Sequence, residues 1–246
     1  MNQTLSLTRD SISALIRKIA LPASVGTFFQ TMFNIVDIFY AGKISPEALS
    51  ALAKSFPIYF IIIAACIGVT VGGTSLIANS IGEGSREKVL SYFSHTIIYG
   101  ILVSILVTIL GLKFSEDVFL LMGSTNEVVL LGLEYTNAIF SGSIIFILVV
   151  ALNALLHAEG DTKTYRNILI LSFFLNIILN PLFIFGYSFI PPMGIKGIAL
   201  ATITAQFIAM CYIIYKAYLT DLKKYLYIKC FFPKPNLIKE LLVQGI

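Results

Sequence analysis

Asp37 is the side chain in this sequence that is best suited to binding a cation. Between Lys18 and Lys43 lie 24 residues, a stretch long enough to cross a lipid bilayer, and Asp37 is the only charged residue among them. A carboxylate at such a position costs roughly 2.5–3.5 kcal/mol on membrane-insertion scales. Acids inside membrane segments usually face a water-filled cavity or a partner, so Asp37 is a candidate for handling an ion or a proton.

Two further polar side chains share a helical face with Asp37. Gln30, Asn34 and Asp37 follow the spacing i, i+4, i+7, which brings them to one side of a helix. We interpret Gln30 and Asn34 as part of the wall of a substrate cavity. The alternative is that both amides hydrogen-bond to neighbouring helices in the membrane and bind no ligand.

A second polar stripe ends at a proline. Ser172, Asn176 and Asn180 recur every four residues, and Pro181 follows directly. Because proline lacks an N–H and clashes with the carbonyl four residues earlier, the carbonyl of Ile177 loses its helical partner. A freed carbonyl beside asparagine side chains offers oxygen ligands of the kind that hard cations prefer. The alternative is an ordinary helix kink with hydrogen bonds between helices.

Other residues with a possible role lie on two further helical segments and near the start of the first one. The last segment contributes the polar residues Thr202, Thr204 and Gln206, of which we place Thr204 on the wall of the substrate cavity, although threonines in membrane helices often bond their own backbone. Pro22 is expected to let the first helix bend, unless it merely occupies a helix start, where proline is tolerated. The Gly68-x-x-x-Gly72 pattern predicts close packing between helices without a ligand.

The composition is that of an integral membrane protein. Hydrophobic residues make up 57% of the chain and charged residues 12%, with a mean hydropathy of +0.90, whereas soluble domains carry about 25% charged residues. Three distant cysteines and two histidines predict no metal site, and no Walker-type phosphate loop is present. The acids are scattered over the loops and do not cluster at one membrane face, so we expect no enzymatic activity. We also expect no cofactor and no nucleic-acid partner.

Six segments are apolar and long enough to cross the bilayer, which predicts an all-α membrane protein with six transmembrane helices. They cover approximately residues 15–41, 52–81, 91–112, 130–156, 167–189 and 195–218. We divide the chain into a six-helix lobe over 1–218, a basic linker over 219–236, and the start of a seventh helix over 237–246. The last segment stops within the predicted helix, which suggests a fragment.

The distribution of basic residues predicts the orientation. Of the 17 Lys and Arg residues, all but Lys43, Lys54, Lys113 and Lys196 fall on one side of the predicted spans. The positive-inside rule then places both ends of the six-helix lobe in the cytoplasm, in the inner (plasma) membrane. The linker charges fit this reading, and an anionic-lipid site is the alternative.

Several stretches, in order along residues 14–218, resemble the N-terminal half of a multidrug and toxic compound extrusion (MATE) transporter. They are Leu21-Pro22-Ala23, Asn34-Ile-Val-Asp37-Ile-Phe-Tyr-Ala-Gly42, Pro46-Glu-Ala-Leu-Ser-Ala-Leu52, Ile81-Gly-Glu-Gly-Ser-Arg-Glu-Lys88, Gly160-Asp-Thr-Lys163, Asn176-Ile-Ile-Leu-Asn-Pro-Leu-Phe-Ile-Phe-Gly186 and Gly194-Ile-Lys-Gly-Ile-Ala-Leu-Ala-Thr202. Each stretch alone is weak evidence for the family, whereas all of them together, in this order, are quite specific for it.

The resemblance implies a fold of twelve helices in two six-helix lobes, of which this chain supplies one. The partner would be a C-terminal lobe or a second copy. It also implies export of organic cations and other amphipathic compounds, driven by inward flow of H⁺ or Na⁺. Asp37 matches the family's coupling acid, and Asn176 and Thr202 match its neighbours. Asn180 departs from the aspartate of many prokaryotic members, which leaves one carboxylate to carry the coupling.

Two other functions remain open at this stage. A flippase for lipid-linked precursors has a related two-lobe fold and, by resemblance, lines its cavity with several Arg or Lys residues to hold pyrophosphate. No basic residue of this chain lies well inside a predicted helix, which argues against a flippase. A non-transporting fragment is the second alternative.

Overall fold

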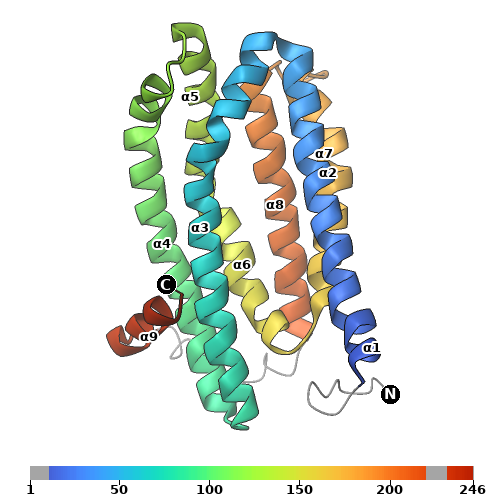
Figure 1. Ribbon diagram of the computed structural model, residues 1–246, viewed down its shortest axis with the longest axis vertical. Coiled ribbons are helices and arrows are strands. Elements are labelled where there is room, and N and C mark those ends of the chain that lie inside the picture. Colours follow the sequence, from blue (N-terminus) through green and yellow to red (C-terminus); the bar gives the residue numbers. More distant parts are fainter. Residues whose placement is uncertain (1–10, 220–231, 246) are drawn as a thin grey trace.

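The computed structural model describes residues 11–219 and 232–245, which form a bundle of long helices joined by short turns (Figure 1). The bounds are α1 Ile12–Leu15, the π-helical turn η1 Ile16–Ala20, α2 Leu21–Ile44, α3 Pro46–Gly82, α4 Arg86–Leu121, α5 Asn126–Ser141, α6 Ser143–Ala158, α7 Thr162–Phe185, α8 Gly194–Leu219 and α9 Pro235–Gly245. Strand pairing in the described ranges is confined to one isolated bridge, between Tyr187 and Ile190.

Polar caps start several of these helices earlier than hydrophobicity predicts. The Ser45 hydroxyl accepts a hydrogen bond from the amide of Ala48 at 3.0 Å, so α3 begins at Pro46 rather than near residue 52. Ser85 caps α4 in the same way, and that helix begins at Arg86 rather than near residue 91. The 37 residues of α3 measure about 55 Å, so the helix extends beyond a hydrocarbon core of about 30 Å.

Four single helices are long and apolar enough to cross a membrane, namely α3, α4, α7 and α8. A fifth span is formed by α5 and α6 together. The first predicted segment, which contains α2, does not meet this criterion because Gln30, Asn34 and Asp37 lower its hydropathy. It nevertheless runs the length of the bundle beside α7 (Figure 1). Each of the six predicted segments is therefore helical, although only five qualify as spans by composition.

The fourth predicted segment, residues 130–156, is a bent pair of helices and not one straight helix. The axes of α5 and α6 differ by 42° across Gly142. At Gly142 an added Cβ atom would lie 2.7 Å from the side chain of Ile203, so a larger residue there would force that side chain of α8 to move. The Thr108 hydroxyl satisfies the Phe140 carbonyl beside the break at 3.0 Å. These contacts come from distant helices, which is why hydropathy alone missed the bend.

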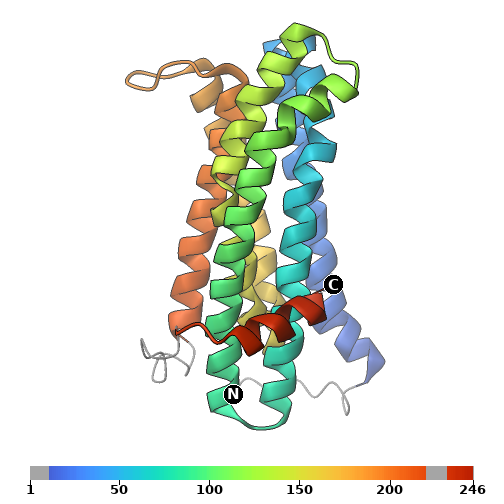
Figure 2. The same cartoon turned by 90° about the vertical axis from the view of Figure 1, so that its left-hand side faces the viewer.

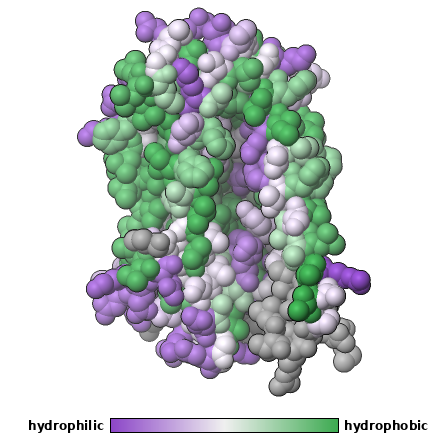
Figure 3. Space-filling model, viewed as in Figure 1, coloured by the Kyte–Doolittle hydropathy of each residue, from purple (hydrophilic) through white to green (hydrophobic). Residues whose placement is uncertain are grey.

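The helices form two groups that face each other across a polar seam. α2, α7 and α8 lie on one side, and α3 to α6 lie on the other (Figure 1). Apolar side chains cover the middle of the surface and polar ones its two ends, while polar residues also line the hollow between the groups (Figure 3). Exposed Ile105, Leu106 and Ile109 on α4 are suited to contact with lipid acyl chains.

The last described helix, α9, crosses the outside of the bundle rather than continuing along it (Figure 2). It begins at Pro235, two residues before the predicted start of a seventh helix. It contacts α3 and α4 near the end of the bundle that carries the Glu83–Ser85 turn. Most of the predicted basic linker, residues 220–231, lies outside the described residues.

Candidate functional site

Asp37 lies on the face of α2 that packs against α7 and α8. The buried residues of α2 recur at helical spacing, and they are Pro22, Gly26, Phe33, Asp37 and Ala41. Only 6% of the Asp37 surface is exposed. The periodicity that predicts one polar face therefore also directs the carboxylate into the protein and away from lipid.

Three neutral side chains donate hydrogen bonds to this carboxylate. Oδ1 of Asp37 accepts from Nδ2 of Asn176 at 2.9 Å and from Nδ2 of Asn180 at 2.8 Å. Oδ2 accepts from the hydroxyl of Thr202 at 3.2 Å. The structure thus brings together the four residues predicted for the cation site, from α2, α7 and α8. Hydrogen bonds of this kind stabilise the charged form, whereas burial opposes it.

One oxygen of this cluster has no partner. Nδ2 of Asn180 also donates to Oδ1 of Asn176 at 3.0 Å, but Oδ1 of Asn180 is buried without a hydrogen bond. A buried polar atom without a partner is destabilising, and functional sites are a common reason to retain one. The cluster therefore offers a free oxygen beside a carboxylate.

The proline of α7 has the predicted effect on the backbone. Pro181 leaves the carbonyl of Ile177 without an N–H four residues on, and the Tyr40 hydroxyl of α2 approaches that oxygen at 3.5 Å. This is a long, weak hydrogen bond. Tyr40 lies one turn after Asp37, so α2 contacts α7 through two polar links. The sequence contained a signal for the freed carbonyl but none for its donor.

A cavity of about 360 Å³ lies against Asp37. Gln30, Asn34 and Thr202 are on its wall, as predicted for the first two from their spacing. A second cavity of about 410 Å³ shares Gln30 and Asn34, so the two adjoin in the seam between the helix groups. The lining of the first cavity includes five aromatic side chains, Phe33, Phe56, Tyr59, Tyr135 and Phe146. Within the described part of the chain, no Lys or Arg lines either cavity.

Thr204, predicted to face the substrate cavity, is absent from the lining of both cavities. At 100° per residue it lies about 200° around α8 from Thr202, on the opposite face. Gln206, about 40° from Thr202 by the same count, lines both cavities instead. Once Thr202 is placed at the site, helical periodicity alone predicts that Gln206, and not Thr204, faces the cavity.

Two other predicted residues stand apart from the Asp37 cluster. Ser172 is buried, but its hydroxyl has no hydrogen-bond partner among the described residues. Pro22 is the second residue of α2, which begins directly after the π-helical turn η1. Irregular turns of this type accompany bends in helices, so a local break in the helical hydrogen-bond pattern lies just before Pro22, and bending at Pro22 stays a prediction.

Fold and site together define a polytopic helical membrane protein with a buried acid beside an internal cavity. The sequence profile of the MatE family matches residues 22–182. The chain therefore belongs to the MatE family, the multidrug and toxic compound extrusion family that its motifs resemble.

Relatives of this chain carry transporter names. It is 31% identical over 231 residues to the probable multidrug resistance protein NorM of Thermotoga maritima, covering 93% of this chain and 49% of that protein. It is 28% identical over 199 residues to the FAD transporter of Shewanella oneidensis, covering 81% and 44%. A MOP superfamily transporter from Pyrococcus furiosus superposes with a TM-score of 0.84 at 28% identity, covering 100% and 54%. The chain spans about half the length of these relatives.

Replacing Tyr40 by phenylalanine should weaken the link between α2 and α7. The Ile177 carbonyl loses its donor, and because the bond is long we expect a loss of about 0.5–1 kcal/mol of stability. Thermal unfolding in detergent measures the effect. The matched control is Tyr187→Phe, in an exposed loop, which should unfold like the wild type. Equal behaviour of both variants would contradict the link.

Thr202→Val and Thr204→Val form a matched pair on α8. Valine keeps the shape of threonine, so Thr202→Val removes only the donor to Oδ2 of the buried carboxylate, and we expect a cost of about 1.5–3 kcal/mol. Thr204→Val should change stability by less than about 0.5 kcal/mol. Denaturant unfolding of the two proteins side by side provides the measurement. A larger loss for Thr204→Val would show that the assignment of faces on α8 is mistaken.

Proposed function

We propose that this chain is one lobe of a cation-coupled antiporter that exports organic cations and related amphipathic compounds. The observation that carries the proposal is the buried carboxylate of Asp37, held by neutral donors on the wall of an aromatic cavity to which the described residues contribute no basic side chain. Such a site can balance one positive charge at a time. Exchange then follows, because a proton and a cationic substrate compete for the same carboxylate.

In the proton scheme, the two oxygens of Asp37 have different roles. Oδ1 accepts two amide hydrogen bonds, while Oδ2 accepts only the bond from Thr202, so Oδ2 has room for the proton. A proton that arrives from outside removes the negative charge and releases the substrate cation. Helix α2 then bends near Pro22 and narrows the cavity, and loss of the proton towards the cytoplasm resets the site.

A sodium scheme uses the same four residues as oxygen ligands. Asp37 and Thr202 already present oxygens, and Oδ1 of Asn180 is free. The amide nitrogens of Asn176 and Asn180 face the carboxylate, however, so their oxygens must turn towards an incoming Na⁺. In the proton scheme neither amide has to rotate, whereas the sodium scheme requires both amides to turn.

The cavity wall supports an aromatic or aliphatic cation as the substrate class. Aromatic rings attract cations through their faces, and five rings line the cavity that contains Asp37. Its volume of about 360 Å³ falls in the usual range of sites for small molecules, about 300–1,000 Å³. The lack of Lys and Arg in the described lining disfavours phosphate-bearing substrates, including the pyrophosphate of a flippase and the FAD named for one relative.

Alternating access requires a second lobe, which we propose to be a C-terminal lobe or a second copy of this chain. Both helix groups described here are needed to form the cavity, and its mouth lies along their seam (Figure 3). We also propose that the end of the bundle bearing the Glu83–Ser85 turn faces the cytoplasm, in the inner membrane. The support is the excess of Lys and Arg at that end.

The test is the binding of tetraphenylphosphonium to the purified chain in lipid nanodiscs. Because the cation requires the charged carboxylate, affinity should rise with pH, and protons should be released on binding at low pH. Asp37→Asn keeps the size of the side chain but removes its charge. We expect binding to weaken at least about tenfold and to lose its pH dependence. Titration with Na⁺ at constant pH then separates the two coupling schemes.

The control is Asp117→Asn, which removes an acid exposed near the end of α4. It should bind the probe as the wild type does. Binding that is equally tight at every pH and Na⁺ concentration would overturn the proposal, as would an Asp37→Asn protein with unchanged pH dependence.

A further inference from the structure

The helix α9 packs on a small and well-defined surface of the bundle, which we call its seat. It lies across the outer faces of α3 and α4, at the end of the bundle that carries the Glu83–Ser85 turn (Figure 2). Leu241 is completely buried there, and it is the only residue of α9 in that class. Leu242 and Val243 remain exposed. A short helix held by one buried side chain depends strongly on the remaining contacts at its seat.

The Gly68-x-x-x-Gly72 face of α3 forms that seat. A Cβ atom added to Gly72 would lie 2.5 Å from the carbonyl oxygen of Leu241, and one added to Gly68 would lie 3.2 Å from that of Gly245. The backbone of α9 therefore touches the backbone of α3, which only glycine permits. The pattern predicted close helix packing, and the structure identifies the partner as α9.

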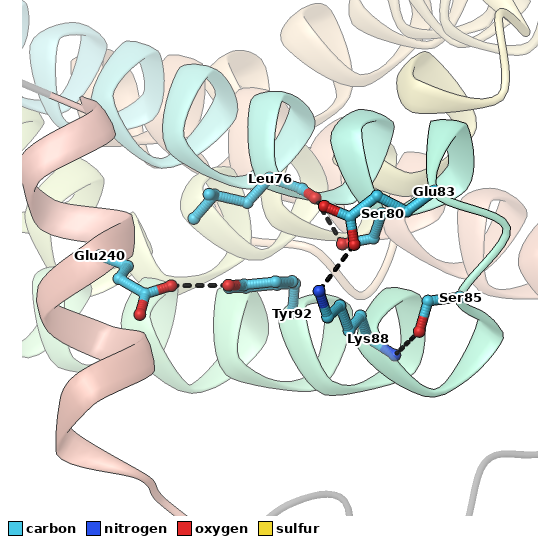
Figure 4. Close-up of polar contacts among 7 residues, drawn as sticks. All are labelled: Leu76, Ser80, Glu83, Ser85, Lys88, Tyr92 and Glu240. Atoms are coloured by element: carbon cyan, nitrogen blue, oxygen red, sulfur yellow. Dashed lines mark hydrogen bonds and ion pairs between the residues drawn. The ribbon is translucent and has the colours of Figure 1, made fainter.

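Three polar contacts fasten α9 and its first residues to the bundle. Oε2 of Glu240 accepts a hydrogen bond from the Tyr92 hydroxyl of α4 at 2.6 Å (Figure 4). The Gln244 amide donates to the Ser75 hydroxyl of α3 at 3.4 Å. Before the helix, the backbone N–H of Lys234 donates to Nε2 of His95 at 2.9 Å.

The contact between Lys234 and His95 requires an uncharged imidazole. Nδ1 of the buried His95 lies 2.7 Å from the Ser91 carbonyl, so Nδ1 carries the hydrogen and Nε2 is the acceptor. A second proton would turn Nε2 into a donor that faces the Lys234 N–H. Two donors repel each other, so protonation of His95 breaks the hydrogen bond from Lys234.

Charged groups of both signs surround this junction. Lys234 and Glu240 come from the α9 side, Glu83 follows the end of α3, and Glu87 and Lys88 belong to α4. Glu83 and Lys88 form an ion pair of 2.6 Å beside Tyr92 (Figure 4). On α6, which packs against α4, the titratable side chain is His157, whose ring contacts Tyr165 of α7. His95 is therefore the group at the junction whose charge must change for the bond to Lys234 to break.

We propose that α9 is a reversible latch across α3 and α4, seated on Gly68 and Gly72, which closes when His95 is neutral and opens when it takes up a proton. Release of the latch frees α9 from the bundle, while α3 and α4 stay joined by the Glu83–Ser85 turn. The proposal stands apart from the Asp37 site, since no latch residue lines the cavity beside Asp37.

Fluorescence quenching can follow the latch directly, because the chain contains no tryptophan. Bimane is attached to Val243→Cys on α9 after replacement of the native cysteines by alanine, and Val71→Trp on α3 supplies the quencher, because both side chains are exposed beside the glycine contact and make none of the three polar contacts. In nanodiscs we expect strong quenching at about pH 8 and loss of most of it at about pH 5, because a proton on Nε2 of His95 removes the acceptor of the Lys234 N–H. The labelled protein without the tryptophan corrects for effects of pH on the dye.

Two pairs of variants test whether His95 causes the pH response and whether Gly72 is needed for the packing of α9. His95→Gln offers an amide oxygen to Lys234 without a titrating group, so quenching should no longer depend on pH, whereas His157→Gln should keep the full response. Gly72→Ala should lose quenching at every pH, whereas Gly82→Ala, whose Cβ would meet nothing within 4 Å, should not. Quenching that stays constant between the two pH values in the labelled protein would overturn the proposal, and so would a full pH response in His95→Gln.

Discussion

The architecture around Asp37 depends on keeping a carboxylate out of water without an opposite charge beside it. Two amides and one hydroxyl replace the solvent, and they come from helices 139 to 165 residues further along the chain. Because each donor must lie within hydrogen-bond reach, α2, α7 and α8 have to pack closely at this level. The freed Ile177 carbonyl and Tyr40 provide a second polar link one turn away. Both links join the bundle to α2, which is not among the helices that qualify as membrane spans by composition.

Neutral donors leave the carboxylate available for a mobile cation, whereas a lysine or arginine partner would neutralise it permanently. The adjoining cavities supply space and aromatic surface for such a cation, and the described lining contributes no competing positive charge. At the end of the bundle another buried titratable side chain, the neutral His95, accepts a hydrogen bond from the backbone N–H of Lys234. In both places the protonation state of one buried side chain decides which hydrogen bonds can exist.

Much of the site could be predicted because helical periodicity places residues on faces. Gln30, Asn34 and Asp37 were expected on one side of a helix, and all three line the cavity. Asn176 and Asn180 were expected together before Pro181, and both reach Asp37. Thr204 was the exception, since the same periodicity turns it away and brings Gln206 to the cavity. The roles of these residues in ion coupling remain predictions.

The sequence by itself determined the membrane class, the helical segments, the polar faces and the family resemblance, because these follow from hydropathy, spacing and motifs along the chain. Only the tertiary structure decided which faces meet. In the folded chain Asp37 accepts hydrogen bonds from α7 and α8, and Tyr40 donates to the freed carbonyl of Ile177. The fourth segment bends at Gly142, and α9 packs on the glycines of α3. The physical reason is that such contacts join residues far apart in the chain. Their formation depends on side-chain volumes and backbone approach in three dimensions, which no local pattern records.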